Sequence, residues 1–105
     1  MGTLVIGLDC AAPEILLRDE RLRNLRQLMA RGCHGRLESV IPPITVPAWS
    51  SMMTGKNPGR LGFYGFRNRK DHSYEGMNFA NSTSVCEPTV WDILSKAGKK
   101  VAEIK

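Results

Sequence analysis

The segment TLVIGLD, residues Thr3–Asp9, decides the expected fold. It is almost continuously apolar, it contains β-branched residues, and it ends at the polar Asp9. A strand buried on both faces has this pattern, and such strands usually belong to parallel sheets covered by helices. Because ligands of open α/β sheets bind at the carboxyl ends of strands, Asp9 is well placed for chemistry. The alternatives are that Asp9 caps a helix beginning near Pro13 or is an ordinary loop acid.

Glycines and prolines divide the rest of the chain into an alternation of helices and strands. One helical stripe contains Leu22, Leu25, Leu28 and Met29, and Gly32 ends it. The other expected elements are a strand over 35–40, a helix over 45–55, a loop over 56–84 with a small hairpin around 77–79, a helix over 88–97 and a strand over 101–104. This order predicts an α/β fold with a mostly parallel sheet flanked by helices. We expect one partial domain over residues 1–105, with the last strand opening a longer sheet.

The composition fits one small globular domain and excludes several other classes. With 105 residues, 42% hydrophobic and 24% charged, the chain has room for one core and is not disordered by composition. It has no run of about 18 apolar residues and no basic, apolar leader, so a cytoplasmic protein is expected. Its three cysteines include no C-x-x-C pair, which agrees with reduced thiols. The net charge of +5 suits an anionic ligand and equally an ordinary basic surface.

Thr45 is the candidate nucleophile. The segment Thr45–Gly55 has the start and stop signals of a helix. Thr45 can cap it, Pro47 is tolerated in its first turn and Gly55 can end it. Unpaired N–H groups at a helix N-terminus favour a bound phosphate or a developing alkoxide. A hydroxyl still needs a metal or a base to become nucleophilic. The alternative is that Thr45 is only an N-cap.

Three further groups are weaker candidates. Asp71-His72 is a pair rather than a metal site, and Cys10 with Cys33-His34 fits no zinc spacing. The basic stretch Lys56–Lys70 contains interleaved aromatic residues and could contact nucleic acid or a charged substrate. A solvated loop with aromatic anchors explains the same stretch.

Two segments together resemble a known family. VIGLDCAAP, Val5–Pro13, resembles the opening of the type I phosphodiesterase and nucleotide pyrophosphatase branch of the alkaline phosphatase superfamily. IPPITVPAWSSMMTGKNPG, Ile41–Gly59, resembles its nucleophile region, in particular that of the bacterial and archaeal group described as predicted phosphohydrolases or phosphomutases. The segment Asn24–Gly32 and the helix starting at Trp91 also fit, so the resemblance runs through most of the chain.

The resemblance implies an alkaline-phosphatase-like hydrolase with two divalent metals, usually zinc and sometimes manganese. Asp9 would be a ligand of one metal, and Thr45 would bind the same metal, lose its proton and attack phosphorus in line. Water would then hydrolyse the phospho-threonine. The implied substrate is a small phosphodiester, pyrophosphate or phosphomonoester, and a phosphomutase is the alternative within the superfamily. The sequence departs from its relatives at Cys10, where glycine is common, at Leu61, where histidine is frequent, and at Phe66, where the pyrophosphatase branch has a phosphate-binding asparagine.

Relatives have additional Asp and His ligands farther downstream, so the resemblance implies that this chain is an N-terminal part and is inactive alone. An unpaired strand edge at 101–104 would then favour association between copies. We expect neither a membrane nor a nucleic acid as partner. The rival from another class is a non-catalytic α/β module that binds anions or nucleic acid through Lys56–Lys70.

Overall fold

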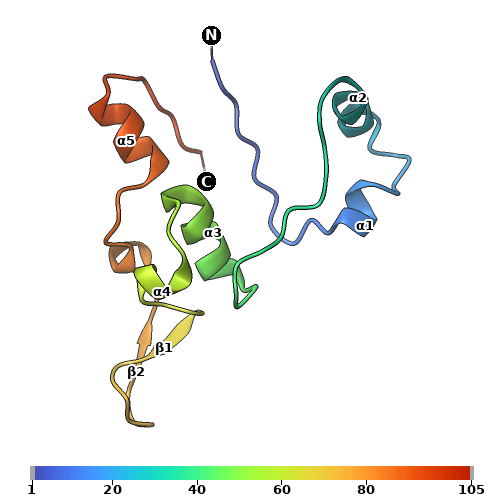
Figure 1. Ribbon diagram of the computed structural model, residues 1–105. Helices are drawn as coiled ribbons and strands as arrows, with labels where there is room; N and C mark the ends of the chain where they lie inside the picture. Colours follow the sequence, from blue (N-terminus) through green and yellow to red (C-terminus); the bar gives the residue numbers. More distant parts are fainter. Residues whose placement is uncertain (1, 105) are drawn as a thin grey trace. The chain divides into compact units, whose positions relative to one another are not determined.

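The computed structural model describes residues 2–104, which divide after Glu38 into two compact units. The first unit contains two helices, and the second contains three helices, a short 3-10 helix and a two-stranded sheet (Figure 1). In chain order the elements are α1 Pro13–Leu16, α2 Arg23–Arg31, α3 Thr45–Thr54, α4 Pro58–Leu61, β1 Arg67–Arg69, β2 Met77–Phe79, η1 Ser82–Ser84 and α5 Val90–Lys96. No helix among residues 2–104 is long and apolar enough to cross a membrane.

The first unit is built from α1 and α2, and the expected helical stripe is confirmed. Gly32 ends α2 as predicted, and its N–H donates to the Leu28 carbonyl at 2.9 Å. Leu22, Leu25 and Met29 are partly covered, whereas Leu28 is 65% exposed. The helix therefore covers only part of its apolar stripe within this unit.

The strands expected at 3–8, 35–40 and 101–104 are not present, so these three predictions are wrong. In the first of these segments Leu4, Val5 and Ile6 are 84%, 74% and 71% exposed. A strand is defined by a neighbour that accepts and donates its backbone hydrogen bonds, so an apolar run alone does not make one. Among residues 2–104 the only paired strands are β1 and β2, which are antiparallel, and the parallel sheet is not present.

In the second unit the ends of the helices follow local chemistry. The expected helix over 45–55 is confirmed as α3, which ends at Gly55 in the left-handed conformation with φ of 68°. Asn57 then caps α4, because its Oδ1 accepts from the Arg60 N–H at 2.8 Å. Pro58 occupies the first helical position, where its missing N–H costs nothing. Thus α3 and α4 follow each other through a short turn and pack together (Figure 1).

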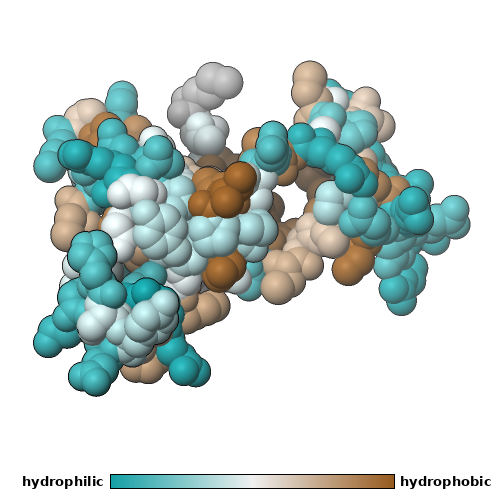
Figure 2. All heavy atoms as spheres, turned by 60° about the horizontal axis from the view of Figure 1, so that its bottom comes forward, coloured by the Kyte–Doolittle hydropathy of each residue, from teal (hydrophilic) through white to brown (hydrophobic). Residues whose placement is uncertain are grey.

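The core of the second unit is small. Its buried apolar side chains are those of Pro47, Pro58, Leu61 and Phe63. Ser51 of α3 is also buried, and among the described residues its hydroxyl has no hydrogen-bond partner. Many apolar side chains remain at the surface, as the brown spheres in Figure 2 show. Leu61 and Phe63 lie in α4 and directly after it, so the core holds the end of α4 in place.

The remaining elements match two further expectations. The hairpin expected around 77–79 is confirmed as β2 paired with β1, with Arg67 opposite Phe79 and Arg69 opposite Met77. The helix expected over 88–97 is confirmed as α5. Thr89 caps α5 through a reciprocal arrangement with Asp92, in which each side chain bonds the other residue's backbone N–H.

This cap makes the stability of the second unit depend on pH in a specific direction. Hydrogen bonds from Thr89 hold the pKa of Asp92 below its ordinary value of 3.8, and the bond from the hydroxyl has a larger effect than the bond from the backbone N–H. A carboxyl group with a depressed folded-state pKa stabilises the fold above its unfolded pKa and loses that contribution as the pH falls through the folded value. Asp92→Asn should therefore lower the urea midpoint of the far-UV circular dichroism signal at neutral pH, and the difference from wild type should shrink below pH 3.8.

Glu20→Gln is the matched control, because Glu20 is an exposed acid of the first unit. Its midpoint should follow that of wild type across the same pH range. A constant difference between Asp92→Asn and wild type down to the lowest pH would show that the charge of Asp92 does not act through this cap.

Candidate functional site

Thr45 is the first helical residue of α3, not its cap. The N-cap is Ile44, with φ of −112° and ψ of 145°, and no side chain caps this helix. The expectation that Thr45 caps α3 is therefore wrong, because the helix begins at Thr45 itself, one residue earlier than a capping threonine requires. The first hydrogen bond of α3 runs from the Ala48 N–H to the Ile44 carbonyl at 3.0 Å. A helix tip without a side-chain cap leaves N–H groups in its first turn that favour an anion.

A tight loop after α4 lies against the residue that precedes Thr45. Gly65 in this loop is buried, and a Cβ placed on it would lie 3.8 Å from Ile44 Cδ1. Asn68 closes the loop, because its Oδ1 accepts from the Tyr64 N–H at 2.7 Å and its Nδ2 donates to the Gly65 carbonyl at 2.9 Å. The loop therefore has a defined shape next to the tip of α3.

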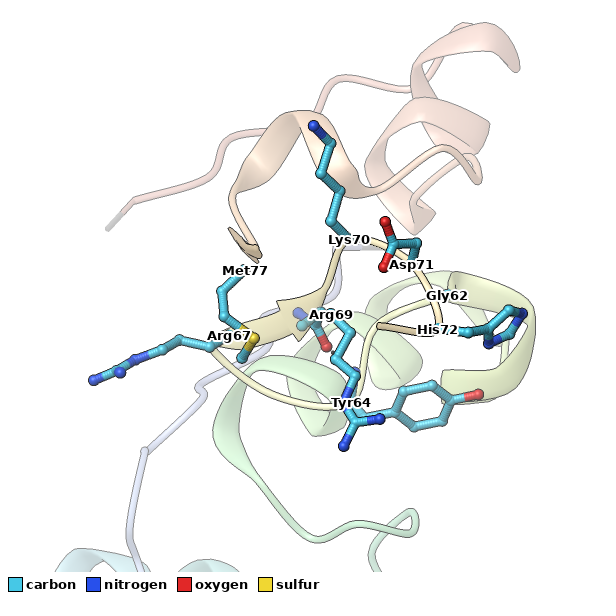
Figure 3. Close-up of a pocket in the computed structure, with 9 residues that line it drawn as sticks. Gly62, Tyr64, Arg67, Arg69, Lys70, Asp71, His72 and Met77 are labelled. Carbon is cyan, nitrogen blue, oxygen red and sulfur yellow. Dashed lines mark hydrogen bonds between the residues drawn. The ribbon is translucent and has the colours of Figure 1, made fainter. Parts of the chain in front are cut away.

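The same loop and the hairpin line an open pocket of about 650 Å³ (Figure 3). The residues that line it are Gly62, Tyr64, Arg67, Asn68, Arg69, Lys70, Asp71, His72 and Met77. Three of them are cationic and one is acidic. The Asp71 carboxylate accepts from the Ser73 N–H at 2.8 Å, and hydrogen bonding to Ser73 lowers the pKa of Asp71. Part of the basic stretch Lys56–Lys70 thus lines this pocket, and Phe63 of the same stretch is buried as an aromatic anchor.

Asp9 belongs to the first unit and is exposed. It does not cap α1, since the N-cap of α1 is Ala12 and no side chain bonds there. Cys10 has φ of 55°, in the left-handed region that favours glycine, and its thiol donates to Asp9 Oδ2 at 3.7 Å. The turn after Asp9 thus has a backbone shape that a glycine would adopt more easily than Cys10 does.

A family model matches residues 3–104 and is described as type I phosphodiesterase / nucleotide pyrophosphatase. The chain belongs to this family. The family is a hydrolase family within the alkaline phosphatase superfamily, so the resemblance noted from the two segments is confirmed. No curated protein and no solved structure matched the chain.

At Cys10 and Phe66 the sequence departs from its relatives, and the structure shows the local surroundings of both residues. The glycine common after the strand acid in this family suits the left-handed turn that Cys10 makes here. At the position of the phosphate-binding asparagine, Phe66 is 59% exposed and has no polar group to offer a phosphate. Asn68, two residues later, is engaged with the backbone of its own loop. Sequence reasoning missed this residue, because an asparagine in a polar loop has no signal that separates a structural role from a binding role.

The weaker metal candidates do not form a cluster. Among residues 2–104 no group of three or more His, Cys, Asp and Glu side chains is placed to hold a metal ion. Asp71 and His72 line the same pocket, but Asp71 is bonded to Ser73. Cys10, Cys33 and Cys86 are exposed free thiols.

The loop next to Thr45 can be tested through Asn68. Asn68→Ala removes one acceptor and one donor, so it should lower the free energy of unfolding by about 1–3 kcal/mol, at roughly 1 kcal/mol for each hydrogen bond. Urea denaturation measures this change. Asn78→Ala is the matched control, since Asn78 is exposed and pairs with Asn68 across the hairpin. Equal losses in the two variants would contradict a special role of Asn68 in closing the loop.

Proposed function

We propose that the chain contains the nucleophile region of a metal-dependent phosphohydrolase, with Thr45 as nucleophile and Asp9 as a metal ligand. The observation that supports this most strongly is the position of Thr45 as first residue of the ten-residue helix α3, at a tip that no side chain caps. Membership in the family agrees with it. The substrate class is a phosphodiester, a pyrophosphate or a phosphomonoester.

The chemical step follows from what a threonine hydroxyl at a helix tip can do. The Thr45 oxygen forms a bond to phosphorus while the bond from phosphorus to the leaving oxygen breaks, and the leaving group departs as an alcohol or phosphate. The proton lost by Thr45 passes to solvent or to the leaving oxygen. Water then attacks the phospho-threonine, which restores the hydroxyl and releases the phosphate product. The N–H groups at the tip of α3 stabilise negative charge on the phosphoryl oxygens.

A divalent metal such as zinc or manganese would, when bound, lower the pKa of the hydroxyl and neutralise charge at phosphorus. Asp9 and Thr45 would hold it. Two oxygen donors are fewer than the three or more protein ligands that a zinc site takes. We therefore propose that the remaining ligands, and those of a second metal, are supplied by residues outside this chain, and that the 105-residue chain alone is inactive.

The test is a set of variants in an enzyme that contains this chain together with its complete ligand set. Thr45→Ala should lower kcat for a nitrophenyl phosphodiester by about a thousandfold or more, because loss of a nucleophile costs that much in comparable enzymes. Thr45→Ser should keep partial activity, since the hydroxyl remains. Asp9→Asn should lower both activity and the zinc content measured by atomic absorption.

Thr54→Ala is the control for Thr45, because Thr54 lies at the other end of α3 and its hydroxyl donates to the Ser50 carbonyl at 2.7 Å. It should affect stability more than turnover. Hydrolysis by Thr45→Ala at the wild-type rate would remove Thr45 from the nucleophile role.

A further inference from the structure

The body and the tip of α3 are held by different parts of the second unit. Pro47 and Ser51 lie on one side of the helix and are buried, so packing fixes the body of α3. The tip is not fixed in this way, because no side chain caps α3 and the N-cap residue Ile44 is 39% exposed. A helix end without a cap frays unless a neighbouring segment holds it. The position of Thr45 therefore depends on what holds Ile44.

Ile44 is approached from two directions. On its own side of the helix, its N–H donates to the Pro42 carbonyl at 2.9 Å, which makes a tight turn before α3. From the loop after α4, buried Gly65 comes so close that a Cβ placed on it would lie 3.8 Å from Ile44 Cδ1 and 3.9 Å from the Arg67 carbonyl oxygen. The Cβ alone would already be at contact distance, so the outer atoms of a larger side chain would compete with Ile44 for space.

Asn68 determines where Gly65 lies. Its Oδ1 accepts from the Tyr64 N–H at 2.7 Å, and its Nδ2 donates to the Gly65 carbonyl at 2.9 Å. One partly buried side-chain amide therefore holds the backbone on both sides of the Tyr64–Gly65 peptide. The far end of the loop has its own anchor, because the Ala80 N–H donates to the Phe66 carbonyl at 2.9 Å. Loss of the Asn68 amide would thus free the near end of the loop, where Gly65 lies.

We propose that Asn68 is a positioning residue for the nucleophile. It holds Gly65 close to Ile44 and thereby fixes the backbone from which the Thr45 hydroxyl extends. The proposal rests on the proposed function for the role of Thr45, and it assigns Asn68 no contact with substrate or metal. Misplacement of a reacting group by about 1 Å costs about a hundredfold in rate, so a residue that acts only through the backbone can still control turnover.

Amide hydrogen exchange of the chain, followed by NMR, tests this without any turnover. The Ala48 N–H reports the start of α3, because it donates to the Ile44 carbonyl at 3.0 Å. The Gly55 N–H reports the end of α3, because it donates to the Ser51 carbonyl at 2.8 Å. Asn68→Ala should raise the exchange rate of Ala48 relative to that of Gly55 by about tenfold or more, since only the start of the helix loses its support.

Three further variants separate positioning from a general loss of stability. Asn57→Ala removes the cap of α4, where Asn57 Oδ1 accepts from the Arg60 N–H at 2.8 Å. It should raise both exchange rates together, so their ratio should stay within about twofold of wild type. Gly65→Leu keeps the Asn68 amide but adds atoms beside Ile44, so it should raise the ratio as Asn68→Ala does. Asn68→Asp keeps the acceptor and loses the donor, so its ratio should be intermediate.

The same variants have distinct kinetic effects in an enzyme that contains this chain with its complete ligand set. Asn68→Ala should lower kcat by about tenfold or more and leave KM within about twofold, because attack depends on the position of the hydroxyl whereas substrate binding does not. Asn57→Ala should keep kcat within about twofold of wild type. A rise in KM with kcat unchanged in Asn68→Ala would contradict a positioning role.

An exchange ratio that is unchanged in Asn68→Ala, or that rises equally in Asn57→Ala, would overturn the proposal. Gly65→Leu decides the question if Asn68→Ala does not fold, and a wild-type ratio in Gly65→Leu would also overturn it. Wild-type hydrolysis by Thr45→Ala would instead refute the proposed function. The exchange ratios would then still show whether Asn68 holds the start of α3.

Discussion

The close approach of Gly65 to Ile44 is the constraint on which the arrangement of the second unit depends, since a Cβ placed on Gly65 would lie 3.8 Å from Ile44 Cδ1. Ile44 is the residue where the extended approach to α3 becomes helical, so whatever holds Ile44 also fixes where α3 begins. Gly65 can lie there because Asn68 closes its loop through the Tyr64 N–H and the Gly65 carbonyl. Phe63, buried immediately before this loop, ties it to the small core. One loop thereby connects the core, the tip of α3 and the pocket.

This arrangement places two chemical features in one unit of the fold. The tip of α3 offers backbone N–H groups and a threonine hydroxyl, which together suit an attack on a phosphoryl group. The pocket offers the guanidinium of Arg69, which lies over the Tyr74 ring, and an acid already bonded to its own loop. The net charge of +5 is compatible with many basic surfaces, but among residues 2–104 the structure shows that Arg21, Arg36 and Arg60 are in ion pairs.

The sequence predicted what is encoded locally. Gly32 and Gly55 end α2 and α3 as expected, because a helix terminus depends on residues within one turn of it. The strand expected at 3–8 failed for the opposite reason: a strand requires a partner from elsewhere, and hydrophobicity cannot name that partner. Thr45 was correctly placed at the start of a helix, but the cap is Ile44, whose backbone is extended with φ of −112° and ψ of 145°. The loop closed by Asn68 and the stacking of Arg69 on Tyr74 depend on three-dimensional contacts that no spacing reveals.

The central claim is that Thr45 becomes covalently bound to phosphorus during turnover. Rapid acid quenching of the active enzyme with a phosphoester substrate, followed by peptide mass spectrometry, measures this directly. The account predicts a phosphoryl adduct on the peptide that contains Thr45, located on Thr45 itself by fragmentation and absent from Thr45→Ala. An adduct on another residue, or complete turnover without any adduct under conditions that slow the second hydrolytic step, would contradict it.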